Sequence, residues 1–253
     1  ESITILYDSV YAEAIDNWFV FEVGADTAFT YVCPNVFQSC GDPISHDGYD
    51  YSTVQIGDQC WFSENCRYLP SVGIPSENEG TPNATVCGYN GTSVEDATNS
   101  LNYQLYGTHY NYGAISQWEI CPTGWHVPSD DDWMEIEAFL GMTEDEIESV
   151  NDSRGYSVGA HLALKNTTGW LIQGNNSTGF SGMSGGWTSS STDLCWYAWE
   201  DENDNGWAMF GCSDYFEDGV MLRGLTDFNG IGITRYILGG NPDIHFSARC
   251  VQD

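Results

Sequence analysis

The chain has 253 residues, of which 41% are hydrophobic and 14% aromatic, enough apolar surface for a folded core rather than a disordered chain. Six Lys and Arg stand against 37 Asp and Glu, giving a formal net charge of -31 that excludes a nucleic-acid backbone as the main partner. No apolar run approaches the roughly 20 residues that cross a bilayer, so we expect no membrane insertion.

The N-terminal part of the chain is predicted to be β structure. Ile3, Ile5 and Tyr7 share one face of a strand at period two, and no charge interrupts them. Two further strands are predicted at 18–23 and 28–33, joined by a Gly-Ala-Asp turn. An isolated strand is not stable in water, so the first one must fold back onto its own domain or add to the sheet of a neighbour.

The rest of the chain shows one clear helical region among short β segments. From Ser129 it carries a capping box with Asp132 and then apolar residues at helical spacing until Gly141, and Thr143 begins a second box. Alternating apolar residues predict strands at 219–222, 234–238 and 245–251. We therefore expect an N-terminal β arm over 1–44 and an α+β domain of mostly irregular β structure over 45–253.

The cysteines and glycosylation motifs indicate a secreted, extracellular or cell-surface protein. Nine cysteines without a Cys-x-x-Cys pair favour an oxidising compartment over zinc or thioredoxin-like chemistry. The start at Glu1 fits either a mature chain without its signal peptide or a trimmed one. Acceptor motifs for N-linked glycans stand at Asn83, Asn90, Asn151, Asn166, Asn175 and Asn176.

Four segments follow one another in the order of a known family. Residues 47–65 are similar to its opening, and residues 121–130 (Cys-Pro-Thr-Gly-Trp-His-Val-Pro-Ser-Asp) match its central signature almost residue for residue. Residues 179–187 and 246–253 (Phe-Ser-Ala-Arg-Cys-Val-Gln-Asp) are similar to its next block and its ending. Over residues 44–253 the chain therefore resembles the Fibrobacter succinogenes major paralogous domain.

The resemblance implies a C-type-lectin-like fold, with one or two short helices on a twisted sheet and the last strand beside the first. It also implies a disulfide between Cys121 and Cys250. The other expected pairs are Cys33 with Cys40 and Cys195 with Cys212. Cys60, Cys66 and Cys87 then leave one thiol over, either free or intermolecular. The family consists mainly of secreted and surface proteins without an established activity. The resemblance therefore indicates where the protein is located better than it indicates a reaction that the protein catalyses.

The evidence for a metal or a catalytic site is weak. Asp201, Asn203 and Asn205 match the first half of a calcium loop, but the closing Glu is missing, and an acidic turn explains the same residues. Calcium is thus the one candidate cofactor, and none is required. Asp131 and Glu135 lie one helical turn apart like a glycosidase pair, although a solvated acidic face is the simpler interpretation. We expect no enzymatic activity.

The N-terminal strand gives the sharpest functional hypothesis. If each copy donates its strand to the next, the contact is heterologous and produces a filament unless it closes into a ring. We therefore expect an extracellular N-glycosylated structural protein, the subunit of a head-to-tail surface fibril whose partners are copies of itself. The alternative is a monomeric secreted carbohydrate-binding domain, lectin-like and calcium-dependent, and a secreted glycosidase-like enzyme comes third.

Overall fold

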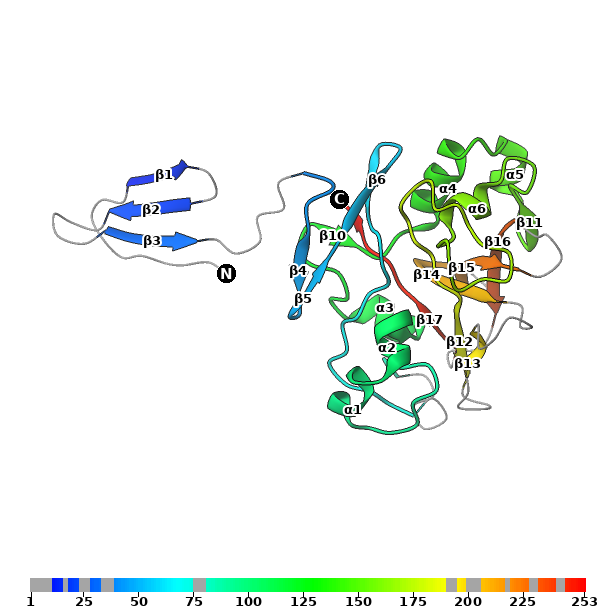
Figure 1. Ribbon diagram of the computed structural model, residues 1–253, viewed down its shortest axis with the longest axis horizontal. Helices are drawn as coiled ribbons and strands as arrows, with labels where there is room; N and C mark the ends of the chain where they lie inside the picture. The colour runs from blue at the N-terminus through cyan, green and yellow to red at the C-terminus, as the bar shows by residue number, and fades with distance from the viewer. Residues whose placement is uncertain are drawn as a thin grey trace.

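The computed structural model of the protein is a mixed α/β structure, made mostly of sheets with a few short helices (Figure 1). It describes residues 11–15, 18–22, 28–32, 39–74, 81–189, 195–198, 206–216, 219–227, 232–239 and 244–253. The expected mixture of sheets and short helices is therefore present, with more helices than the one or two that the sequence predicts.

The N-terminal arm contains a three-stranded antiparallel sheet in the order β1–β2–β3. Its strands are β1 (Tyr11–Ile15), β2 (Trp18–Glu22) and β3 (Ala28–Val32). The sequence predicts the hairpin of β2 and β3, in which Trp18 is opposite Val32. It does not predict β1, because the Ala-Glu-Ala at its centre has low strand propensity. Ile3, Ile5 and Tyr7 lie outside the described residues.

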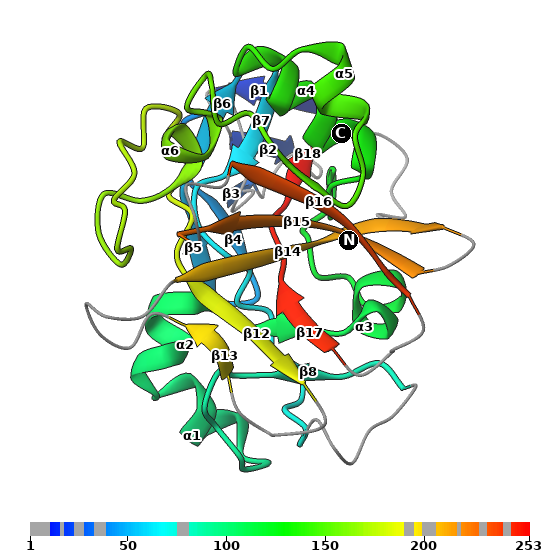
Figure 2. The same cartoon turned by 90° about the vertical axis from the view of Figure 1, so that its right-hand side faces the viewer.

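Two hairpins precede the helices, and the chain returns to them at its end. The strands of this part are β4 (Ile44–His46), β5 (Tyr49–Tyr51), β6 (Thr53–Ile56), β7 (Gln59–Phe62), β10 (Trp125–His126) and β18 (Val251–Gln252). Asp47 and Gly48 turn the first hairpin with φ angles of 49° and 77°, the left-handed conformation that a two-residue turn requires. In the sheet β10–β18–β7–β6, Val251 is opposite Trp61, so the last strand lies beside an early one (Figure 2).

A nine-stranded sheet forms the body of the domain, in the order β11–β16–β15–β14–β12–β17–β9–β8 with β13 beside β12 (Figure 2). Its strands are β8 (Ala84–Thr85), β9 (His109–Tyr110), β11 (Asp152–Arg154), β12 (Gly185–Ser189), β13 (Cys195–Ala198), β14 (Trp207–Phe216), β15 (Gly219–Thr226), β16 (Ile233–Gly239) and β17 (Ile244–Ser247). The strands predicted at 219–222 and 234–238 lie within β15 and β16. The one predicted at 245–251 is divided between β17 and β18, which belong to different sheets.

Short helices fill the connections. They are α1 (Val94–Thr98), α2 (Leu101–Tyr106), α3 (Tyr112–Gln117), α4 (Asp130–Phe139), α5 (Glu144–Glu148) and α6 (Ala160–Leu164). All of these except α6 have a side-chain N-cap. Both predicted capping boxes are confirmed: Ser129 bonds reciprocally with Asp132 at the start of α4, and Thr143 with Glu146 at the start of α5. The sequence does not predict the other helices, which are too short to show an apolar period.

The core has two parts, one on each face of the large sheet, because neighbouring side chains of a strand point to opposite faces. On one face Phe210 of β14 packs with Trp61, Trp133 and Phe180, whose rings meet at 5.1–6.0 Å. On the other face, the cluster around Met209 includes residues of α3 and of the β4–β7 region. The sheet is thus covered on both sides over most of its length.

The disulfides differ from the expected pairs in two cases. Cys121 bonds to Cys250, the pair that the family resemblance implies, with 5.8 Å between their Cα atoms. The expected Cys33–Cys40 pair is wrong, because Cys40 bonds to Cys60; Cys33 itself lies outside the described residues. The expected Cys195–Cys212 pair is also wrong. Cys195 bonds to Cys87, while Cys212 is a buried free thiol in the core beside α4.

Candidate functional site

An apolar groove of about 230 Å³ lies on the large sheet, on the face opposite α4. Residues opposite one another in neighbouring strands share a face, and Leu222 of β15 is opposite Tyr236 of β16, with Met209 of β14 on the same side. The residues that line the groove are Trp187, Trp207, Met209, Leu222, Tyr236, Ile237, Leu238 and Ile244. Among these described residues there is no charged side chain, so the groove fits an uncharged, apolar ligand.

Aromatic rings form one wall of this groove. Trp187 and Trp207 meet edge to face with 5.4 Å between ring centroids, and the Tyr236 ring lies 6.3 Å from that of Trp207. Gly224 makes this arrangement possible, since a Cβ there would lie 2.7 Å from the Trp207 Nε1. The aromatic rings and Leu238 remain only half-buried. Half-exposed apolar side chains gathered in one place are typical of a surface that binds another molecule.

The groove lies next to the part of the β16 edge where the described ladder with β11 has ended. In the part of the chain that the structure describes, the ladder between β11 and β16 stops at Arg235. Beyond it, the Ile237 N–H donates to the Asn151 side-chain oxygen at 3.3 Å rather than to a strand. Among the described residues no strand pairs with this side of β16 beyond Arg235, so a strand added here, next to the apolar groove, would have to replace the Asn151 contact.

His126 lies between two other grooves, of about 610 and 500 Å³. Its Nδ1 is 2.7 Å from the Asp253 carboxylate and its Nε2 is 3.1 Å from Asp132, the capping residue of α4. Burial lowers the pKa of His126, but the two carboxylates outweigh it and hold the pKa above its usual value. His126 thus links Asp253, next to the last strand, to Asp132 at the start of α4.

The carboxylates that the sequence singles out as a possible glycosidase pair lie at the surface, and Glu135 lines the groove of about 500 Å³. Asp131 and Glu135 are both exposed on α4. The exposed positions agree with the solvated acidic face that the sequence favours. The candidate calcium ligands Asp201, Asn203 and Asn205 lie outside the described residues.

Nearly all the basic side chains are inside the molecule. Of the six Lys and Arg, the five buried ones are Arg154, Lys165, Arg223, Arg235 and Arg249. Glu137 of α4 is fully buried and binds Arg154 through both carboxylate oxygens, at 2.7 and 2.9 Å, and Arg223 at 2.8 Å. Lys165 pairs with Asp227 at 2.6 Å. Since these cations are used internally, the charge at the surface is overwhelmingly negative.

The glycosylation motifs differ in how well the structure exposes them. Asn90, Asn151 and Asn175 are exposed, and Asn166 and Asn176 are half-exposed. The Asn83 side chain is only 4% exposed. A buried amide has no room for a bulky glycan, so Asn83 is withdrawn from the candidate sites. The other motifs remain predictions.

Because two histidines are buried, we expect the folded protein to lose stability in acid. Burial, with a smaller effect from His245, lowers the pKa of His109 to about 3, and burial lowers that of His161 to about 4. Both are therefore neutral in the folded protein and protonated in the unfolded chain below about pH 6.5. We expect the free energy of unfolding to fall between pH 6.5 and 4, by about 3 kcal/mol from His109 alone.

Urea denaturation at a series of pH values measures this loss. His109→Gln should make the curve shallower than in the unmodified protein. Equal slopes for the unmodified protein and His109→Gln between pH 6.5 and 4 would contradict the role given to His109.

Comparison with known proteins gives one match. The family model described as the Fibrobacter succinogenes major domain matches residues 54–252. No curated protein and no solved structure matches the chain. In the part of the chain that the structure describes, no helix has the length and apolar character needed to cross a bilayer.

Proposed function

The chain belongs to the Fibrobacter succinogenes major domain family, and from this premise we propose that it is an extracellular, N-glycosylated structural protein. It is the subunit of a head-to-tail surface fibril, in which each copy donates its N-terminal strand to the next. The arm over residues 1–44 is the donor part, and the domain over 45–253, with a C-type-lectin-like fold, is the acceptor. The protein has no catalytic activity in this proposal.

The apolar groove on the large sheet is the main support for strand donation. A strand that carries Ile3, Ile5 and Tyr7 on one face presents three apolar side chains in a row, and the groove offers apolar and aromatic walls for them. The end of β16 next to the groove, beyond the described ladder with β11, supplies main-chain groups for a new ladder once the Asn151 contact with Ile237 is released. Groove and edge together match what a donated strand needs, pockets for one face and hydrogen bonds along one side.

The charge of the protein supports an uncharged contact between copies. With a net charge of -31 and five of six basic residues buried, two copies repel each other over most of their surfaces. An interface made by main-chain hydrogen bonds and apolar side chains avoids placing these carboxylates face to face. The same charge, with glycans at exposed motifs away from the β16 edge, such as Asn90 and Asn175, keeps finished fibrils apart.

Removal of residues 1–8 is expected to leave only monomers where the full chain forms filaments, as seen by negative-stain electron microscopy. Ile3→Asp with Ile5→Asp should have the same effect, because it places charges on the apolar face of the strand. Ser2→Asp with Thr4→Asp is the matched control: it adds equal charge to the opposite face and should still give filaments. Filaments from the truncated chain, or monomers from the full chain, would contradict strand donation.

The runner-up is a monomeric carbohydrate-binding protein, and the aromatic wall of the groove favours it. Trp187, Trp207 and Tyr236 are residue types that stack on sugar rings. A lectin also needs polar groups that bind the sugar hydroxyls. The described lining of the groove has no charged side chain that could bind them. Binding to a glycan array that is lost in a calcium chelator would favour this alternative over the fibril.

A further inference from the structure

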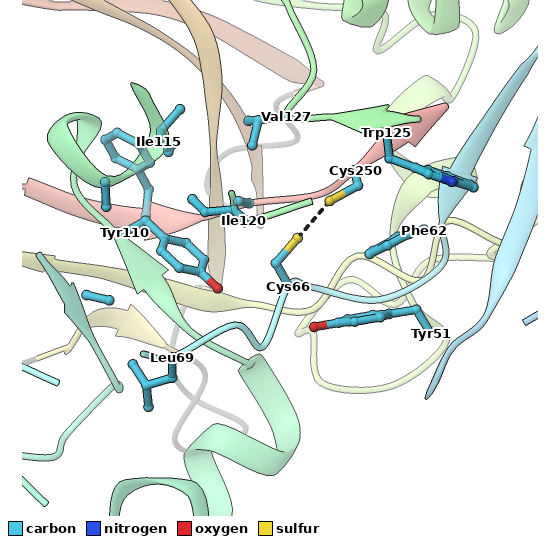
Figure 3. Close-up of a cluster of buried hydrophobic side chains, with 14 of the residues drawn as sticks. Tyr51, Phe62, Cys66, Leu69, Tyr110, Ile115, Ile120, Trp125, Val127 and Cys250 are labelled. Atoms are coloured by element: carbon cyan, nitrogen blue, oxygen red, sulfur yellow. Dashed lines mark hydrogen bonds between the residues drawn. The ribbon is translucent and has the colours of Figure 1, made fainter. Parts of the chain in front are cut away.

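Three cysteine sulfurs meet in the core where the last strand crosses the domain, and Figure 3 shows two of them, those of Cys66 and Cys250. Cys121 and Cys250 are bonded to each other, and the free Cys66 Sγ lies 3.4 Å from the Cys250 Sγ. Cys66 is held there by its own backbone, whose N–H donates to the Ala248 carbonyl at 2.9 Å. The backbone position of Cys66 therefore helps to fix the distance between the Cys66 and Cys250 sulfurs, and the rotamer of the Cys66 side chain does not set it alone.

We propose that Cys66 is a second disulfide partner for Cys250, so that the three sulfurs form an exchange unit. The Cys66 thiolate attacks the Cys250 Sγ, a Cys66–Cys250 bond forms, and the Cys250–Cys121 bond breaks. The electron pair leaves on the Cys121 Sγ, which takes up a proton equivalent to the one that Cys66 lost. One disulfide replaces another, so the step needs no oxidant or reductant.

The exchange moves a thiol from the core to a groove. Cys66 is fully buried among Tyr51, Phe62 and other apolar residues (Figure 3), whereas Cys121 is half-buried and lines the groove of about 610 Å³. After exchange the reactive sulfur is therefore at the groove wall, where thiol reagents and disulfides of other molecules reach it. The last strand remains tied to the domain in both states, because Cys250 is bonded in each.

The chain-entropy model does not strongly favour either pairing. The Cys121–Cys250 bond closes a separation of 129 residues, and Cys66 stands 184 residues from Cys250. Because the entropy of loop closure depends on the logarithm of loop length, these two loops restrict the unfolded chain to a similar degree. Local packing therefore decides which bond predominates.

The native arrangement keeps the exchange slow at neutral pH. All three sulfurs lie within 4.8 Å of one another, so Cys66 stands beside the S–S bond and must rotate before in-line attack. Burial raises the pKa of its thiol to about 12, with Arg249 and Glu64 acting in opposite directions. The nearby Tyr51 and Tyr110 hydroxyls stay neutral, since burial raises the pKa of both. The rate should therefore rise about tenfold per pH unit from pH 7 to 10.

Alkylation of the full, unreduced protein with iodoacetamide between pH 7 and 10, followed by disulfide mapping by mass spectrometry, tests the exchange. We expect alkylated Cys121 and a Cys66–Cys250 linked peptide to appear in equal amounts. Cys66→Ser should abolish the labelling of Cys121, whereas Cys212→Ser, which removes the other described free thiol, should not affect it. Labelling at Cys66 with Cys121–Cys250 intact, or no labelling of Cys121 at pH 10, would overturn the proposal.

A second variant tests the alternative bond without relying on the exchange rate. Cys121→Ser, refolded in a mixture of reduced and oxidised glutathione, should contain a Cys66–Cys250 disulfide. The double variant with Cys66→Ser lacks both bonds and should unfold at lower urea concentration than Cys121→Ser alone. If Cys66 and Cys250 of the Cys121→Ser variant are free or carry glutathione, Cys66 is not a partner of Cys250.

Discussion

Glu137→Gln is expected to lower the free energy of unfolding by about 3–5 kcal/mol. The Glu137 carboxylate is fully buried and holds Arg154 at 2.7 Å and Arg223 at 2.8 Å, and both guanidinium groups are themselves buried. The amide keeps the shape of the side chain but removes its charge. Two buried cations then lose a counter-charge, which costs far more than a surface ion pair contributes.

Urea denaturation of the two proteins measures this difference, and the same helix supplies the control. Glu135 is exposed on α4, two residues away, so Glu135→Gln should change the free energy of unfolding by less than about 0.5 kcal/mol. Similar small losses for both variants would show that Glu137 is not the centre of the buried charge network.

Leu238→Asp is expected to abolish filament formation while leaving a folded monomer. Leu238 is half-buried at the end of β16 and lines the apolar groove. A carboxylate there would be buried under the donated strand without a partner, which costs several kcal/mol and opposes each contact along the fibril. Negative-stain microscopy measures filaments, and near-ultraviolet circular dichroism checks that the variant is folded.

Leu101→Asp is the matched control for this prediction. Leu101 is 67% exposed on α2, far in sequence from the groove, and the substitution adds the same charge to the surface. It should leave filament formation intact, since its carboxylate stays in water. If Leu238→Asp still forms filaments, the groove does not receive the strand.

The sequence predicts the elements that depend on local rules. Both capping boxes carry their signal within four residues, so α4 and α5 start where Ser129 and Thr143 place them. The helix α1 has a similar signal, with Ser93 capping the Asp96 N–H, but it is only five residues long. The division of the last segment into β17 and β18 could not be predicted, because it depends on which of two sheets each part joins.

The disulfides and the groove depend on distant parts of the chain. Cys87 meets Cys195 across a separation of 108 residues, because β13 lies beside β12 in the large sheet. Spacing in the sequence favours short loops such as Cys195–Cys212 and gives no hint of this pairing. The groove likewise combines side chains from five strands. In the sequence, nothing distinguishes its Trp187 and Trp207 from the many other aromatic residues.

The basic residues are so few that their presence in the sequence is informative about the structure. In a chain with 37 acidic and only six basic residues, each Lys or Arg is rare enough to suggest a specific role. Glu137 follows Trp133 by four residues, so it falls on the buried face of the helix rather than on the acidic outer face. An acidic residue at a core position, together with scarce arginines, predicts a buried charge network, although not which residues pair.

A mixing experiment tests strand donation into the groove most directly. The chain without residues 1–8 keeps a groove but has no strand, and the Leu238→Asp variant keeps its strand but has a blocked groove. Each alone should be a monomer in size-exclusion chromatography with light scattering. Mixed, they should form a one-to-one dimer of twice the monomer mass and no filament, since the dimer has neither a free strand nor an open groove. Two separate monomers in the mixture would contradict donation of the N-terminal strand to this groove.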